Sequence, residues 1–233
     1  IASRLGRPNV AGIAEMMNFP GVFLGWESEL AKIALGKHTT VDGHSPGLTG
    51  GPLNAYILAG VRSDHECTTL AEAREKLRRG MHILLREGTA ERNLHDLLPL
   101  VTATNAMNFS FATDDKHPAD LEDEGHIDHH LREAIAFGLN PVVAFQLASI
   151  STARHYRLRN LGAIAPRFRA DLIVFDDLRN VHASMVYHHG RLVAEDGRYL
   201  VPDPPSPDDA HLRDTMHMRS FEPSALSLPA RGT

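Results

Sequence analysis

The chain has 233 residues, of which 42% are hydrophobic and 23% charged, as in an ordinary globular protein. Its net charge of −5 gives no reason to expect nucleic acid or an anionic membrane as a partner. The single cysteine, Cys67, excludes an internal disulfide, and neither a membrane-length apolar run nor a secretory signal is visible, so we expect a cytoplasmic protein.

Strand patterns alternate with helical patterns from Val10 to Tyr156, which is typical of a parallel sheet built from βα units. The predicted strands are Val10–Met16, Thr39–Asp42, Val61–Asp64, Met81–Arg86 and Asn108–Ala112. The predicted helices are Glu27–Leu35, Pro52–Ala59, Thr69–Arg79, Asn93–Thr104, Glu122–Phe137 and Pro141–Tyr156. These units are too few to close a barrel, so we predict an α/β fold in which residues 1–158 form about the last five units of a TIM-type (β/α)8 barrel.

The pattern changes after Tyr156. Short strands separated by turn residues follow one another without helical periodicity, which predicts a small β-sandwich domain over residues 159–201. Residues 202–233 are rich in proline and have little pattern, which indicates a linker or an irregular segment.

Four side chains with metal-binding chemistry stand where predicted strands end: Glu15, His44, His65 and Asp114. Because the carboxyl ends of parallel barrel strands meet at one rim, we expect these side chains to lie together. A lone histidine is more often a hydrogen-bonded loop residue, but four such residues at equivalent positions favour a metal site. Imidazole and carboxylate ligands without thiolate suit zinc, iron(II) or manganese.

The segments around these residues resemble a known family. Residues 41–48, 60–68, 83–89 and 111–120 look like successive strand-end motifs of the adenine deaminases, a group of metal-dependent amidohydrolases. Residues 12–22 resemble the segment that bears the bridging glutamate of that family, and residues 162–176 resemble the strand signature that closes most amidohydrolases. The resemblance extends over about Val10 to Gly197.

The resemblance implies hydrolytic deamination of adenine to hypoxanthine and ammonia, a step of purine salvage, by a metal-bound hydroxide. It implies a binuclear centre of Mn²⁺ or Fe²⁺, with Zn²⁺ as a further option, in a homo-oligomer that binds a small purine. Glu15 would bridge the two metals, His44 and His65 would bind the second, and Asp114 would bind the first. The His-x-His pair on the first strand of the family has no counterpart here.

Two residues are candidates for proton transfer. Asp114 would take the proton of the hydroxide and pass it to the departing ammonia. Glu66 would protonate ring nitrogen N1, or else would orient the imidazole of His65 as a supporting carboxylate.

Other polar residues near the strand ends are weaker candidates. Arg86 and Glu87 would contact the purine or form a salt bridge across the rim. Asp115 and His117 would support the metal aspartate, and Asp64 would orient a ligand histidine or cap the following helix.

Two alternatives remain open. One is a cyclic amidase of the dihydroorotase or hydantoinase type, in which a carboxylated lysine typically bridges the metals. The chain offers a glutamate at that place and no lysine before Lys32, which favours the deaminase. The other is a truncated homologue without catalytic activity, since the His-x-His pair is lacking.

Overall fold

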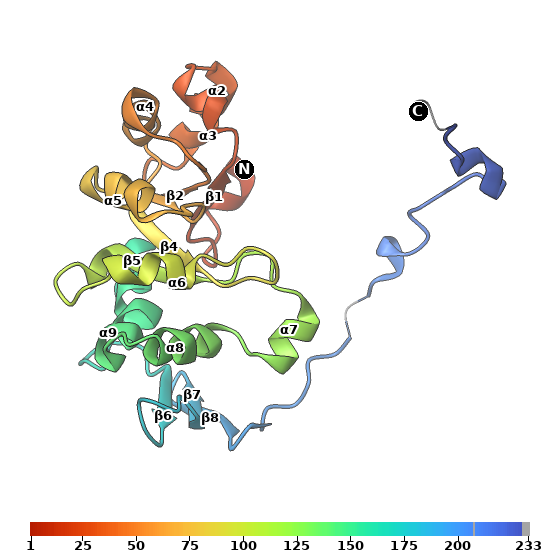
Figure 1. Ribbon diagram of the computed structural model, residues 1–233. Helices are drawn as coiled ribbons and strands as arrows, with labels where there is room; N and C mark the ends of the chain where they lie inside the picture. The colour runs from red at the N-terminus through yellow and green to blue at the C-terminus, as the bar shows by residue number, and fades with distance from the viewer. Residues whose placement is uncertain (207, 230–233) are drawn as a thin grey trace. The chain divides into compact units, whose positions relative to one another are not determined.

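The computed structural model describes residues 1–206 and 208–229 and shows parallel strands that alternate with helices (Figure 1). The chain divides into two compact units, residues 1–200 and 201–233. Among the described residues, no helix is both long and apolar enough to cross a membrane.

The strands of the α/β part follow one another in chain order. They are β1 (Gly12–Met16), β2 (Thr40–Gly43), β3 (Ser63–Asp64), β4 (His82–Arg86) and β5 (Phe109–Ala112), each within two residues of the predicted bounds. The strand β1 pairs in parallel with β2, and β3, β4 and β5 form a second parallel ladder. Between the ladders, the Arg62 amide donates to the Val41 carbonyl at 3.0 Å, so the strand order continues from β2 to β3.

Helices separate these strands. They are α1 (Ala2–Leu5), α2 (Phe19–Phe23), α3 (Glu27–Leu35), α4 (Gly50–Ala59), α5 (Leu70–Arg78), α6 (Leu94–Leu97), α7 (Pro118–Asp123), α8 (Ile127–Ala136), α9 (Pro141–Gln146) and α10 (Thr152–His155). Short 3-10 helices are η1 (Leu98–Leu100), η2 (Ala106–Asn108), η4 (Ala210–Leu212) and η5 (Pro223–Leu226), and η3 (Leu147–Ser151) is a π-helical turn.

Two predicted helices were too long. The α-helix expected over Asn93–Thr104 ends at Leu97, because Pro99 has no amide hydrogen to continue it and lies in a 3-10 turn. The helix expected over Glu122–Phe137 is divided into α7 and α8 at Gly125, whose φ of 105° favours glycine.

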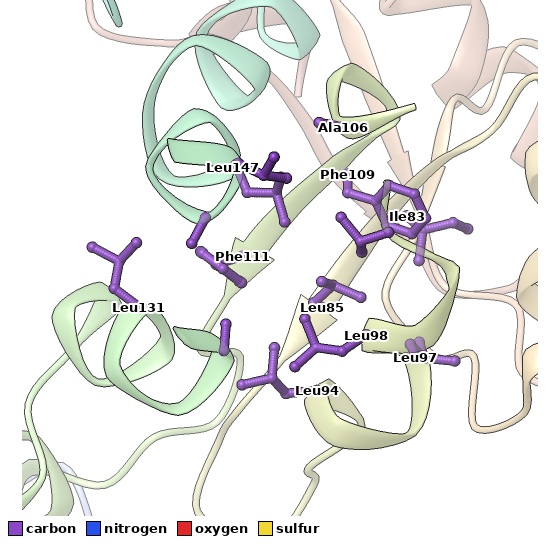
Figure 2. Packing of buried hydrophobic residues seen from close by; sticks show 14 of the residues in the cluster. Ile83, Leu85, Leu94, Leu97, Leu98, Ala106, Phe109, Phe111, Leu131 and Leu147 are labelled. Atoms are coloured by element: carbon purple, nitrogen blue, oxygen red, sulfur yellow. The ribbon is translucent and has the colours of Figure 1, made fainter. Parts of the chain in front are cut away.

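The larger apolar core lies between β4, β5 and the helices that follow them, as Figure 2 shows. Ile83, Leu85 and Phe109 come from the strands and are fully buried, and Leu94 of α6 and Leu147 of η3 pack against them. All five residues of β4 are buried, as expected for a parallel strand that is covered on both faces. A second cluster joins β1 and β2 to α2, α3 and α4.

The last part of the first unit is a four-stranded antiparallel sheet. Its strands are β6 (Leu172–Phe175), β7 (Ala183–His188), β8 (Arg191–Glu195) and β9 (Arg198–Tyr199), in that order. The Phe175 ring packs edge-on against Phe145 of α9, with 4.9 Å between ring centroids. The sheet is consistent with the predicted small β domain.

A buried histidine predicts how stability depends on pH. His82 is 8% exposed, and burial, together with the neighbouring His155, lowers its pKa to about 3. In the unfolded chain the His82 imidazole takes up a proton near pH 6.5, whereas in the folded protein it stays neutral until the pH approaches 3. Neutral His82 therefore contributes fully to the free energy of unfolding above pH 6.5, and this contribution is lost as the pH falls toward 3. We expect the free energy of unfolding to fall by about 2 kcal/mol more in the wild type than in a His82→Gln variant between pH 6.5 and 5. Urea unfolding at both pH values measures this difference, and equal losses in the two proteins would contradict it.

Candidate metal centre

The four strand-end residues expected to share a metal lie together. Glu15 is in β1. His44 directly follows β2, His65 directly follows β3, and Asp114 follows the end of β5 after one intervening residue. Nε2 of His65 lies 2.9 Å from Oε2 of Glu15 and 3.7 Å from Oδ2 of Asp114. Nδ1 of His44 lies 3.8 Å from the same Glu15 oxygen. Parallel strands in chain order bring these distant positions to one edge.

Glu66 is part of the same cluster. Its Oε1 lies 3.2 Å from Nε2 of His65 and 3.5 Å from Nδ1 of His44. The ligand atoms of Glu15, His44 and His65 lie within 4.8 Å of one another, and so do those of His65, Glu66 and Asp114. Two overlapping groups of possible ligands therefore share His65, an arrangement that could hold two neighbouring cations.

The chemistry of the cluster fits divalent cations. Nδ1 of His44 is buried and has no hydrogen-bond partner among the described residues. A buried polar atom without a partner destabilises a fold, and a bound cation would satisfy it. Nitrogen and oxygen donors of this kind suit manganese, iron(II) and zinc.

Arg86, the last residue of β4, closes one side of the cluster. Its side chain is 3% exposed, and its guanidinium donates hydrogen bonds to Glu66 and Asp114. Burial alone would lower the pKa of Arg86, but these two hydrogen bonds raise it. Arg86 therefore places a permanent positive charge beside two carboxylates. Two roles were predicted for Arg86, contact with the purine or a salt bridge across the rim, and the structure shows the salt bridge.

Three of the weaker candidates lie away from the cluster. Glu87 lines a separate pocket of about 420 Å³ with Arg92 and His95, and burial raises its pKa. The structure therefore places Glu87 in a pocket apart from the cluster that Arg86 contacts, and Glu87 forms an ion pair there with Arg92 at 3.6 Å. Asp115 and His117 are exposed, and over the described part of the chain their side chains form no hydrogen bond or ion pair with the cluster.

Asp64 holds the loops that carry residues of the cluster. It is fully buried, and its Oδ1 accepts hydrogen bonds from the backbone amide and the hydroxyl of Ser45, at 2.7 and 2.8 Å. Its Oδ2 accepts from the Glu66 amide at 3.1 Å. Asp64 thus holds the backbone of two loops, while Thr69 caps the helix that Asp64 was predicted to cap.

Asn93 and Tyr56 are among the supporting residues that the sequence analysis missed. The Asn93 side chain donates to the carbonyls of His65 and Cys67, at 2.9 and 3.0 Å, and accepts from the Arg86 amide at 2.7 Å. The Tyr56 hydroxyl donates to the carbonyl of Met16 at 2.6 Å and so ties α4 to β1. No local pattern marks these residues, because each contacts loops that are distant in the sequence.

An open cavity of about 370 Å³ adjoins the cluster. Glu15, His65 and Asp114 line it together with Asp42 and Tyr156. The Tyr156 hydroxyl donates to Oδ2 of Asp42 at 2.7 Å. The cavity is large enough for a small planar molecule next to the cluster.

Residues 27–193 match the amidohydrolase family. The chain is 48% identical to an adenine deaminase of Dehalococcoides mccartyi over 233 residues, which are 100% of this chain and 41% of the relative. It is 50% identical over 196 residues to an adenine deaminase of Kosmotoga olearia, over 83% of this chain and 34% of the relative. The chain thus spans about two fifths or less of the length of these relatives.

Solved structures share the fold at lower identity. A beta-aspartyl dipeptidase of Fervidobacterium islandicum superposes with a TM-score of 0.59 at 18% identity, over 78% of this chain and 54% of that chain. An N-acetyl-D-glucosamine-6-phosphate deacetylase of Mycobacterium smegmatis superposes with a TM-score of 0.57 at 20% identity, over 72% of this chain and 52% of that chain.

Proposed function

Since the chain belongs to the amidohydrolase family, we propose that it supplies part of the active site of an adenine deaminase. The reaction is the hydrolysis of adenine to hypoxanthine and ammonia. The observation that carries the proposal is the convergence of Glu15, His44 and His65 into one group of possible metal ligands. The adenine deaminases that are 45–50% identical to the chain support the choice of substrate.

We propose further that the five parallel strands are the last five of a (β/α)8 barrel. The chain order of the strands and the polar cluster at their carboxyl ends support this reading. The small antiparallel sheet would belong to a β-sandwich domain. The remaining two ligands, a His-x-His pair on the first strand, would come from outside this chain.

In this proposal His44 and His65 would hold one cation, Asp114 would hold a second, and Glu15 would be shared between them. The cations would be Mn²⁺ or Fe²⁺, with Zn²⁺ as a further option. When bound, such a cation would lower the pKa of a coordinated water to roughly 7, so that a nucleophile is present at neutral pH.

The protein groups then handle the protons. Asp114 accepts the proton of the attacking water and delivers it to the amino group that leaves as ammonia. Glu66, whose Oε1 is 3.2 Å from Nε2 of His65, takes up the other proton of that water and delivers it to ring nitrogen N1, which needs a proton when C6 is attacked, so that both protons of the water are used. Arg86 contacts both carboxylates and therefore fixes their separation.

The test is a substrate comparison on the complete enzyme, loaded with Mn²⁺, Fe²⁺ or Zn²⁺. We expect release of ammonia and hypoxanthine from adenine, and no ring opening of dihydroorotate or hydantoin. Turnover of a cyclic imide in place of adenine would favour the cyclic amidase. A metal-loaded protein that turns over neither substrate class would favour the non-catalytic homologue. The homo-oligomer and the cytoplasmic location stay predictions.

A further inference from the structure

A buried lysine next to the candidate metal centre has no part in the proposed chemistry. Lys76 lies in α5, and both its side chain and that of Asp64 are 0% exposed. Lysine is rarely fully buried unless it is paired, because removing an ammonium group from water is very unfavourable. A lysine in this position therefore needs a structural reason.

Every donor of this ammonium group is used. Nζ of Lys76 donates to the carbonyl of Ser45 at 2.6 Å, to Oδ2 of Asp64 at 3.0 Å and to Oε1 of Glu72 at 2.6 Å. An ammonium group has three donors, so the set is complete. The three partners come from the loop after β2, from β3 and from α5 itself.

The two acidic partners of Lys76 also accept hydrogen bonds from backbone amides of the same loops. Asp64 accepts from the Ser45 and Glu66 amides, and Glu72 accepts from the Gly47 amide at 2.8 Å. Through Asp64 and the Ser45 carbonyl, Lys76 is thus connected to the backbone of the two loops that follow β2 and β3.

We infer that Lys76 is a positioning residue of the metal centre: together with Asp64, it fixes the two loops that carry the ligand histidines. The contacts fall on Ser45 and Glu66, each of which directly follows one of those histidines in the chain. A backbone held at the next residue limits the directions in which each imidazole can point. Groups that orient ligands in this way commonly account for 10–100-fold in metal affinity.

This inference rests on the proposed metal centre, so its test reads metal binding directly. The main variant is the double substitution Asp64→Asn with Lys76→Met, because removal of the lysine alone leaves a buried carboxylate without its counter-ion. Arg79→Met is the matched control. Arg79 lies one turn further along the chain from Lys76 and pairs with Glu75 and Asn54, outside the histidine loops.

The measurement is a Mn²⁺ titration of the metal-free complete protein, with free Mn²⁺ followed by electron paramagnetic resonance. We expect the dissociation constant of the double variant to rise at least about tenfold, with thermal unfolding still cooperative and with the Arg79→Met protein unchanged. If the double variant does not unfold cooperatively, Asp64→Asn with Lys76→Gln, which keeps a hydrogen-bond donor at position 76 and leaves no unpaired Asp64 carboxylate, is judged by the same criterion.

The outcomes separate the two proposals. A folded variant with wild-type Mn²⁺ affinity would overturn the positioning role of Lys76 and leave the metal centre standing. A wild-type protein that binds no Mn²⁺, Fe²⁺ or Zn²⁺ would overturn the proposed function and, with it, this inference.

Discussion

Replacement of Asp114 by asparagine is expected to lower kcat for adenine by about 10²–10⁴-fold, the usual contribution of a positioned proton-transfer group. An amide cannot take the proton of the attacking water and return it to the leaving group. It is also a weaker ligand for a divalent cation than a carboxylate is. Asparagine tolerates the left-handed backbone at this position, where φ is 52°, so the loop should keep its shape.

Asp115→Asn is the matched control for this experiment. It makes the same chemical change one residue along the chain, at an exposed side chain outside the cluster. We expect kcat to change less than about twofold, because exposed substitutions away from a site have small effects. Steady-state assays of both proteins, each with its metal content measured, make the comparison. Equal losses in the two variants, or full activity in Asp114→Asn, would contradict the proton-transfer role.

Replacement of His65 by asparagine is expected to abolish tight binding of divalent metal. His65 belongs to both ligand groups of the cluster, so its loss removes a ligand atom from each of them. A metal that binds only the folded protein raises the free energy of unfolding, by about 2.7 kcal/mol when the free metal concentration is a hundred times Kd. The variant should therefore lose both the bound metal and the rise in Tm that the metal gives.

Elemental analysis and thermal unfolding with and without Mn²⁺ test this prediction. The control is His117→Asn, an exposed histidine outside the cluster, which should keep both the metal and the rise in Tm. If the His65 variant retains a full complement of metal, His65 is not a ligand.

The positions of the site residues followed largely from sequence patterns. Glu15, His44, His65 and Asp114 were predicted to lie together because each stands where a strand pattern gives way to a loop. The carboxyl ends of successive parallel strands lie on one edge, so no knowledge of side-chain packing was needed.

Glu87 shows where that reasoning fails. Arg86 and Glu87 were treated as a pair, but Arg86 ends β4 and Glu87 directly follows it, and successive side chains of an extended backbone point to opposite sides. Arg86 reaches the cluster, and Glu87 lines another pocket with Arg92. The alternation along the strand could have separated them. The alternation could not show whether Arg86 or Glu87 points toward the cluster, because that depends on the register of β4 against β5.

The order of strands and helices, the residues at the strand ends and the resemblance to adenine deaminases could be predicted from the sequence. These features depend on local periodicity and on short motifs. The polar residues that support the cluster, among them Lys76, Asn93 and Tyr56, became apparent from the folded structure. Hydrogen bonds of these residues join segments separated by 7 positions (Asn93 with Arg86), 31 positions (Lys76 with Ser45) and 40 positions (Tyr56 with Met16) in the chain. Such bonds depend on how close packing brings distant segments together, and a local pattern carries no record of that.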